Sequence, residues 1–141
     1  MTDLEPLKIK YQRYLQKALG HLEKSYLKAQ NLPTSLEACT DDQLETWESF
    51  TSRFARVVDI FLTKYLRILL IQTDPGFDGT LKDLLNLAEK YKLISSATLW
   101  MSFREFRNIQ AHDYTEESFQ AFVSGLIKNT PVLLDLKEKL E

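Results

Sequence analysis

The chain has 141 residues, 44% of them hydrophobic, and contains only 4 Gly and 4 Pro. This length suits one domain with a single core, and the scarcity of Gly and Pro within long periodic segments favours an all-α fold. The formal net charge of -2 does not indicate a nucleic-acid binder, so any contact with RNA would need a local concentration of Lys and Arg.

Two further classes of protein are not expected from the composition. The single cysteine, Cys39, allows no internal disulfide and no metal site built from several cysteines. The N-terminal sequence lacks the apolar segment of a signal peptide, and no apolar run approaches the roughly 20 residues that a membrane helix needs. We therefore expect a cytoplasmic protein without a membrane segment.

The first helix is predicted to begin near residues 4–6 and to end at about Gln30. Its expected core stripe consists of Leu7, Tyr11, Leu15, Ala18, Leu22 and Tyr26. The opposite side carries Lys10, Lys17, His21, Lys24 and Lys28. A basic strip of this kind could bind RNA or an acidic partner, but a solvated helix face is the more common arrangement and the interpretation favoured here. Pro33, within residues 31–35, predicts a turn.

The second helix is expected to start at residues 40–42, with Thr40 or Asp41 as its cap, and to continue to about Gln72. About 30 residues exceed an ordinary globular helix, which predicts either a bend or a rod that spans the bundle. Its apolar residues cover more than half of the circumference, so it should be the central helix: Trp47, Phe50, Phe54, Val57, Val58, Phe61, Leu62, Tyr65, Leu66, Leu69 and Leu70.

The same helix carries a second basic stripe. Four cations fall within about 80° on the helical wheel, with Asp59 nearby: Arg53, Arg56, Lys64 and Arg67. A solvated face is again favoured, and the alternatives are a wall that guides phosphates or a ladder of subunit contacts. Asp59 is the natural anionic partner for a buried arginine.

Shorter helices are expected in the second half of the chain. Residues 73–79 contain Asp-Pro-Gly and Asp-Gly turn signals, and Thr80 is predicted to cap a short helix with five inward residues: Leu81, Leu84, Leu85, Ala88 and Tyr91. Ser95 or Ser96 should cap the next helix. The helix after Thr115 should run to about Asn129, where Pro131 is expected to force a break or kink before a final short helix or tail. The prediction is a single domain over residues 1–141, an antiparallel four-helix bundle with short additional helices.

The segment RNIQAHDY at residues 107–114 holds the densest hydrogen-bonding chemistry of the chain. It ends a predicted amphipathic helix, and Arg107, Gln110 and Tyr114 fall on the apolar face of that helix. His112 lies about 140° from Arg107 on the wheel. Either the helix unwinds so that the two side chains converge, or the flank of His112 faces another protein chain. Thr115 is predicted to cap the next helix, whose free backbone N–H groups could receive a phosphate.

These residues resemble the Arg-x-x-x-x-His-x-Tyr signature of HEPN-domain proteins. The segments SRFARVVDIFLTKYL and GTLKDLLNLAEKYKLI, the latter leading to Trp100, also resemble the HepT toxins of MNT/HepT toxin-antitoxin pairs, described as nucleotidyltransferase substrate-binding proteins as well. The resemblance covers most of the chain between Trp47 and Phe122. It implies a homodimeric, metal-independent ribonuclease without a cofactor, in which the motif arginine and histidine of two copies face each other.

The resemblance also assigns roles. Metal-free RNA cleavage needs a base, an acid and positive charge on the phosphorane, so His112 would transfer protons and Arg107 would hold the scissile phosphate. Supporting residues would be Asn108, Asp59 and Arg56. Tyr114 matches the tyrosine to which the partner MNT nucleotidyltransferase attaches AMP. The implied partners are a second copy or a higher oligomer, this nucleotidyltransferase, and RNA or a nucleotide. The alternative is a non-catalytic subunit that binds a nucleotide or substrate for a separate nucleotidyltransferase.

Overall fold

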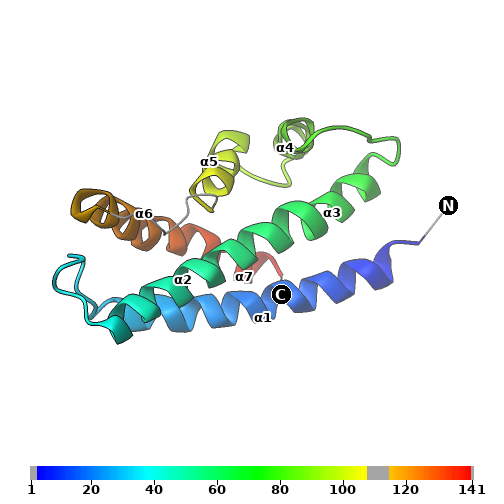
Figure 1. Cartoon of the computed structure of the whole chain (residues 1–141). Coiled ribbons are helices and arrows are strands. Elements are labelled where there is room, and N and C mark those ends of the chain that lie inside the picture. The colour runs from blue at the N-terminus through cyan, green and yellow to red at the C-terminus, as the bar shows by residue number, and fades with distance from the viewer. Residues whose placement is uncertain (1–2, 108–114, 141) are drawn as a thin grey trace.

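A computed structural model describes residues 3–107 and 115–140 as an all-α bundle (Figure 1). Its helices are α1 (Glu5–Ala29), α2 (Asp41–Ile60), the π-helix η1 (Phe61–Tyr65), α3 (Leu66–Thr73), α4 (Leu81–Lys90), α5 (Ala97–Arg107), α6 (Glu116–Leu134) and α7 (Leu136–Lys139). The long elements are α1, the continuous α2–η1–α3 helix, α5 and α6, which confirms the predicted fold class. Every helix within the described ranges is too short or too polar to cross a membrane.

Helices α1 and α2 form an antiparallel pair. Near one end Tyr26 of α1 meets Phe50 of α2, with ring centroids 6.4 Å apart. Further along, the Lys64 ammonium of η1 lies 5.9 Å from the ring centroid of Tyr11 on α1. Residue numbers rise along α2 as they fall along α1, as expected when a short connection joins two long helices.

The expected long second helix is present as three consecutive segments. In η1 the Leu66 N–H donates to the carbonyl of Phe61 five residues earlier, so the turn is wider than in an α-helix. The ring of Phe61 stacks on Trp100 of α5 at 4.3 Å. The buried Tyr65 faces α1, where burial and then the Glu5 carboxylate raise the pKa of its hydroxyl. Within this wide turn, Phe61 therefore packs on α5 while Tyr65 faces α1.

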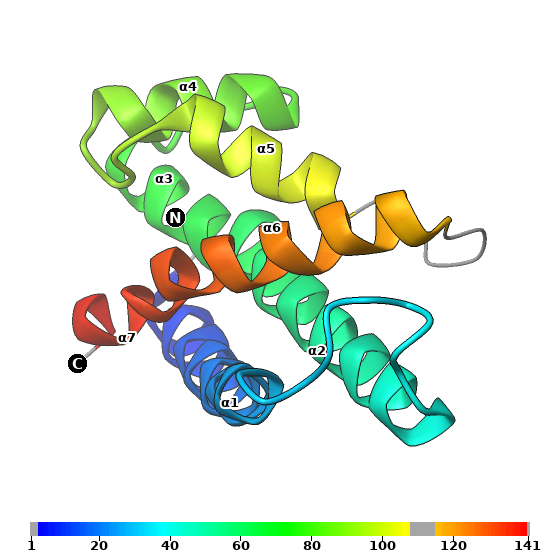
Figure 2. The same ribbon diagram turned by 90° about the vertical axis from the view of Figure 1, so that its left-hand side faces the viewer.

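Helices α5 and α6 pack on α2 beside α1 (Figure 2). Phe54 of α2 meets Phe103 of α5 edge to face at 6.1 Å, and Trp47 meets Phe119 of α6 at 6.5 Å. The largest fully buried side chains come from α1, the continuous α2–η1–α3 helix, α4, α5 and α6: Phe50, Phe54, Phe103, Phe119, Leu15, Leu19, Leu22, Leu62, Leu66, Leu70, Leu84 and Leu85.

Capping boxes begin three of the helices. Thr40, Thr80 and Thr115 each accept a hydrogen bond from the backbone N–H three residues later, and the side chain of that later residue accepts from the backbone N–H of the threonine. Ser96 likewise accepts from the N–H of Leu99 at 3.1 Å. These bonds confirm the predicted cap positions. Caps are predictable from sequence because each one satisfies backbone donors within its own turn.

Of the break or kink expected at Pro131, the break is wrong. Helix α6 continues through Pro131 to Leu134, and the interruption comes at Asp135. Pro131 removes one backbone donor, but its carbonyl still accepts from the N–H of Asp135 at 3.1 Å. Leu133 and Leu136 are buried on either side of the interruption. Burial of these side chains therefore holds the last turn in place.

The predicted core position is also wrong for two residues. Leu7 is 39% exposed and Tyr91 is 38% exposed. Leu7 lies near the N-terminal end of α1, and Tyr91 is the C-cap of α4, followed by Lys92 with a left-handed φ of 62°. Both residues have the helical spacing of a core position but lie at helix ends that other elements do not fully cover.

Candidate functional site: the α5–α6 junction

The RNIQAHDY segment begins where α5 ends. Arg107 is the last residue of α5, and α6 starts at Glu116 (Figure 2). Asn108, Gln110, His112 and Tyr114 lie outside the described residues. Both alternatives for His112, convergence with Arg107 and a flank that faces another chain, therefore stay predictions. The described residues establish how both flanks of the segment are held.

The flank before the segment is anchored by aromatic contacts. The ring of Phe106 stacks on Phe122 of α6, with centroids 4.9 Å apart and planes at 8°, and meets Phe54 of α2 at 5.5 Å. Phe103, one turn earlier, is fully buried. A Cβ atom added to Gly125 of α6 would lie 2.8 Å from Cε2 of Phe106. The absence of a side chain at Gly125 thus leaves room for the last turn of α5.

The flank after the segment is anchored by Glu116, the first residue of α6. Its carboxylate accepts hydrogen bonds from the Ser35 hydroxyl, from the N–H of Leu36 at 2.9 Å and from the N–H of Glu37 at 3.0 Å. The pKa of Glu116 is lowered, chiefly by the bond from Ser35 and then by the donors of Glu37, Gln120 and Leu36. The carboxylate therefore ties the turn between α1 and α2 to the start of α6.

The start of α6 was expected to offer free backbone N–H groups to a phosphate, and protein groups already use part of this site. Thr115 Oγ1 accepts from the N–H of Ser118 at 3.1 Å, so this donor is already used. Glu116 and Glu117 place two carboxylates in the first turn. Negative charge at this position already offsets the positive end of the helix dipole, which favours cationic side chains over free N–H groups as phosphate ligands.

The two supporting residues predicted on the second helix both lie on α2. Asp59 is half-buried, and its backbone carbonyl accepts from Thr63 Oγ1 at 2.6 Å. Arg56 is exposed, and its charge acts on His21 of α1. Helix α2 also carries Phe54, which contacts Phe106, so Asp59 belongs to the element against which the end of α5 packs.

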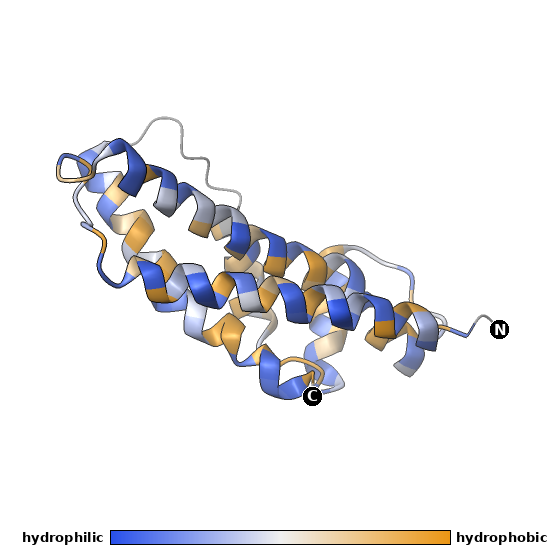
Figure 3. Cartoon of the chain, turned by 90° about the horizontal axis from the view of Figure 1, so that it is seen from below, coloured by the Kyte–Doolittle hydropathy of each residue, from blue (hydrophilic) through white to orange (hydrophobic). Residues whose placement is uncertain are grey.

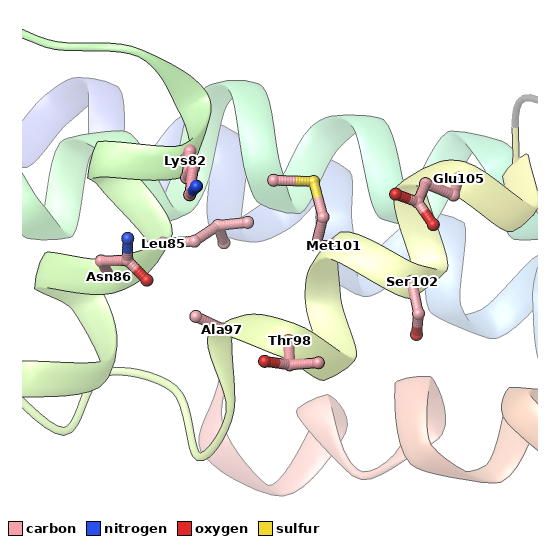
Figure 4. Close-up of a pocket in the computed structure, with 8 residues that line it drawn as sticks. All are labelled: Lys82, Leu85, Asn86, Ala97, Thr98, Met101, Ser102 and Glu105. Atoms are coloured by element: carbon pink, nitrogen blue, oxygen red, sulfur yellow. The ribbon is translucent and has the colours of Figure 1, made fainter.

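A groove of about 450 Å³ lies between α4 and α5 (Figure 4). Leu85, Ala97 and Met101 form its apolar part. Its polar lining consists of Lys82, Asn86, Thr98, Ser102 and Glu105. Glu105 lies two residues before Arg107, so the groove leads toward the RNIQAHDY segment. Met101 is half-buried here, on the flank of α5 that would face another chain in one of the two alternatives for His112.

The described residues contain no group of three or more His, Cys, Asp or Glu side chains that could hold a metal ion. Cys39 is half-buried, and its thiol donates to the carbonyl of Pro33 at 3.5 Å. Burial is the main cause of its raised pKa. A raised pKa lowers the thiolate fraction, so Cys39 acts as a structural residue of this turn.

Two features were not predicted from the sequence: the hydrogen bonds from residues 35–37 to Glu116, and the groove between α4 and α5. Glu116 was recognisable as a first-turn acid, but its bonds to residues 35–37 join positions about 80 residues apart along the chain. The groove combines exposed residues of two helices whose relative placement the sequence does not specify. Comparison of the chain with protein-family models, with curated proteins and with solved structures found no match.

Proposed function

We propose that this chain is a HepT-like ribonuclease of the HEPN class, the toxin of a toxin-antitoxin pair. The observation that carries the proposal is that the Arg-x-x-x-x-His-x-Tyr sequence begins at the last residue of α5 and ends just before the cap of α6. Both flanks are anchored, by Phe106 on one side and Glu116 on the other. Anchored flanks fix the two ends between which the motif lies, and catalytic side chains depend on such positioning.

The proposed chemistry is metal-independent cleavage of RNA by transfer of the phosphoryl group to the ribose 2'-OH. His112 removes the proton of the 2'-OH or protonates the leaving 5' oxygen, and Arg107 stabilises the charge of the phosphorane. Asn108 orients the histidine or the substrate. Asp59 orients Arg107, and Arg56 adds positive charge to the phosphate path.

One copy of the motif provides only one histidine for two proton transfers. The proposal is therefore a homodimer in which two copies of Arg107 and His112 meet about a two-fold axis. The groove beside Met101 supports this arrangement, because it leaves an apolar part of α5 open next to the motif. A nucleotidyltransferase partner that attaches AMP to Tyr114 would place a bulky anion beside the arginines and repel RNA. A ribonuclease of this kind acts on cellular RNA, so a cytoplasmic location is part of the proposal.

The test is expression of the chain without a partner. We expect growth arrest and cleavage of added RNA by the purified protein without a metal. His112→Ala and Arg107→Ala should each lower the cleavage rate by about 10²- to 10⁴-fold, the range for loss of an acid-base group or charge stabiliser. Arg104→Ala is the matched control, because Arg104 is an exposed arginine one turn earlier on α5. Full activity of His112→Ala with an unchanged circular dichroism spectrum would refute the proposal.

A second candidate function is favoured by the groove between α4 and α5. A volume of about 450 Å³ with an amide, two hydroxyls, a lysine and a carboxylate around an apolar part suits a nucleoside-sized ligand. A non-catalytic nucleotide-binding subunit predicts no growth arrest, together with AMP binding by calorimetry that Asn86→Ala weakens. Growth arrest that depends on His112 excludes this candidate as the main function.

A further inference from the structure

Two basic stripes that are separate in the sequence lie next to each other in the fold. On α1 the exposed or half-exposed residues Lys10, Lys17, His21, Lys24 and Lys28 fall within about 60° of one another. On α2 and η1 the corresponding residues are Arg53, Arg56 and Lys64. We call these eight residues the basic face. Figure 3 views α1 from its outer side, and hydrophilic residues recur along it.

Direct contacts join the two stripes. Arg53 Nη1 donates to the carbonyl of His21 at 3.2 Å and to Ser25 Oγ at 2.8 Å. His21 lies among the cations of both helices: its pKa is lowered by burial first and then by Arg53, Lys24, Lys17 and Arg56. The cations from α1 and α2 therefore act on a common region of the surface.

Among the described residues, the salt bridges of the structure leave out the basic face. The ion pairs between described residues are Lys8 with Glu5 and Lys137 with Glu23, and neither includes a member of the face. Glu5 and Glu23 are about 140° from Lys10 on the α1 wheel. The seven Lys and Arg of the face carry a charge of +7, and the chain as a whole has a net charge of -2, so the remaining residues sum to -9.

Acidic side chains lie at one end of the basic face. Asp42 and Glu45, with Lys28 and Arg53, line a cavity of about 210 Å³ at the N-terminal end of α2. Lys10 and Lys28 are about 27 Å apart along α1, at about 1.5 Å per residue. This distance can hold several nucleotides of an extended strand, and the acidic end limits the strand on one side.

An exposed aromatic ring lies within the basic face. Tyr14 is 51% exposed, and its ring meets Tyr11 edge to face at 5.8 Å. The Lys10 ammonium lies 5.8 Å from the ring centroid of Tyr14. Exposed aromatic rings that alternate with cations are the features with which proteins bind single-stranded nucleic acid, because bases stack on the rings while cations contact phosphates.

We propose that the basic face binds single-stranded RNA, with backbone phosphates along Lys10 to Lys28 and Arg56, and a base stacked on Tyr14. The inference rests on the proposed ribonuclease function, and it gives the substrate a binding surface distinct from the α5–α6 junction. An acidic membrane surface would also attract the lysines. The exposed aliphatic residues of α1 are Leu7 and Ile9 at one end and Leu27 at the other, so they do not form the continuous apolar strip with which helices insert into lipid.

The test measures binding of a fluorescein-labelled single-stranded RNA by anisotropy at several salt concentrations, with wild-type protein and with His112→Ala. The face variant is Lys17→Ala/Lys24→Ala/Lys28→Ala. The matched control, with the same change of net charge, is Lys90→Ala/Lys128→Ala/Lys139→Ala, three exposed lysines on α4, α6 and α7. A second pair compares Tyr14→Ala with Tyr91→Ala, an exposed tyrosine at the end of α4.

We expect the face variant to weaken RNA binding at least tenfold. The negative slope of log K against log salt should become shallower by about 2, since each lost contact to a single strand contributes about 0.7. Tyr14→Ala should weaken binding severalfold, and both controls should bind like the parent protein. Equal effects of face and control variants would overturn the proposal. Binding of the face variant to phosphatidylserine vesicles is measured as well. Loss of vesicle binding by this variant while its RNA binding persists would also overturn the proposal.

The same data separate this proposal from the ribonuclease function. RNA binding that depends on the face without cleavage by the wild-type protein would support the basic face and refute the ribonuclease. Cleavage that depends on His112, with a KM unaffected by the face variant, would support the ribonuclease and refute the basic face.

Discussion

Phe106 and Phe122 stack with their rings almost parallel, and Gly125 one turn along α6 leaves the space that this contact requires. The pair joins the last turn of α5 to the middle of α6. Any rearrangement there would shift the start of the RNIQAHDY segment relative to the rest of the bundle. This contact therefore connects core packing to the geometry of the proposed catalytic residues.

Gly125→Ala is expected to destabilise the protein, because its Cβ would lie 2.8 Å from the Phe106 ring. Overpacking of this kind costs about 1–3 kcal/mol, which should outweigh the higher helix propensity of alanine. The control is Gly20→Ala in α1, where an added Cβ has no neighbour within 4 Å. This change should raise the free energy of unfolding by about 0.5–1 kcal/mol. Urea unfolding measures both variants, and similar stabilisation of the two would contradict the tight contact.

Glu116→Gln is expected to lower stability at neutral pH and to have little effect in acid. The folded state lowers the pKa of Glu116 below its usual 4.5, so its contribution to stability is present above that value and is lost as pH falls through the folded pKa. The difference in urea midpoint between wild type and Glu116→Gln should shrink below about pH 4. Glu117→Gln, at the exposed neighbouring position, is the control, and an equal loss of stability in both variants would contradict the assigned bonds of Glu116.

Lys92→Gly should stabilise the C-terminus of α4. Lys92 has a φ of 62°, its N–H donates to the carbonyl of Glu89, and the N–H of Leu93 donates to that of Ala88. This pattern is a Schellman motif, in which glycine is favoured at the left-handed position. We expect a gain of about 1 kcal/mol in the free energy of unfolding. Lys90→Gly, inside the last turn of α4, should instead destabilise by about 1 kcal/mol, and the opposite order in urea unfolding would refute the assignment.

Tyr114→Phe tests the proposed regulation. Co-expression with a neighbouring nucleotidyltransferase should add AMP to the wild-type chain, and intact-mass spectrometry should detect no adduct on Tyr114→Phe. The variant should also remain toxic in the presence of the partner, because the anion that blocks the phosphate site is missing. Tyr91→Phe is the control for a second exposed tyrosine. An adduct that persists on Tyr114→Phe would place the modification elsewhere.

Most of the fold follows from local sequence signals. Thr40, Thr80 and Thr115 were predictable as caps because the donors they satisfy lie within three residues. The apolar residues of the second helix were predictable because a helix buried on most sides must be apolar on most sides. Leu7 and Tyr91 were wrongly predicted to lie in the core, and a break at Pro131 was wrongly predicted, since burial and helix continuation at these positions depend on neighbouring elements.

The sequence by itself determined the all-α class, the helix starts and the position of the RNIQAHDY segment between α5 and α6, because hydrophobic periodicity and capping act over a few residues. Only the tertiary structure decided that Glu116 binds residues 35–37, that Phe106 reaches Phe122, and that the cations of α1 and α2 share one face. These arrangements depend on how helices are oriented about one another. That orientation comes from side-chain packing between distant segments, which the local pattern of residues does not encode.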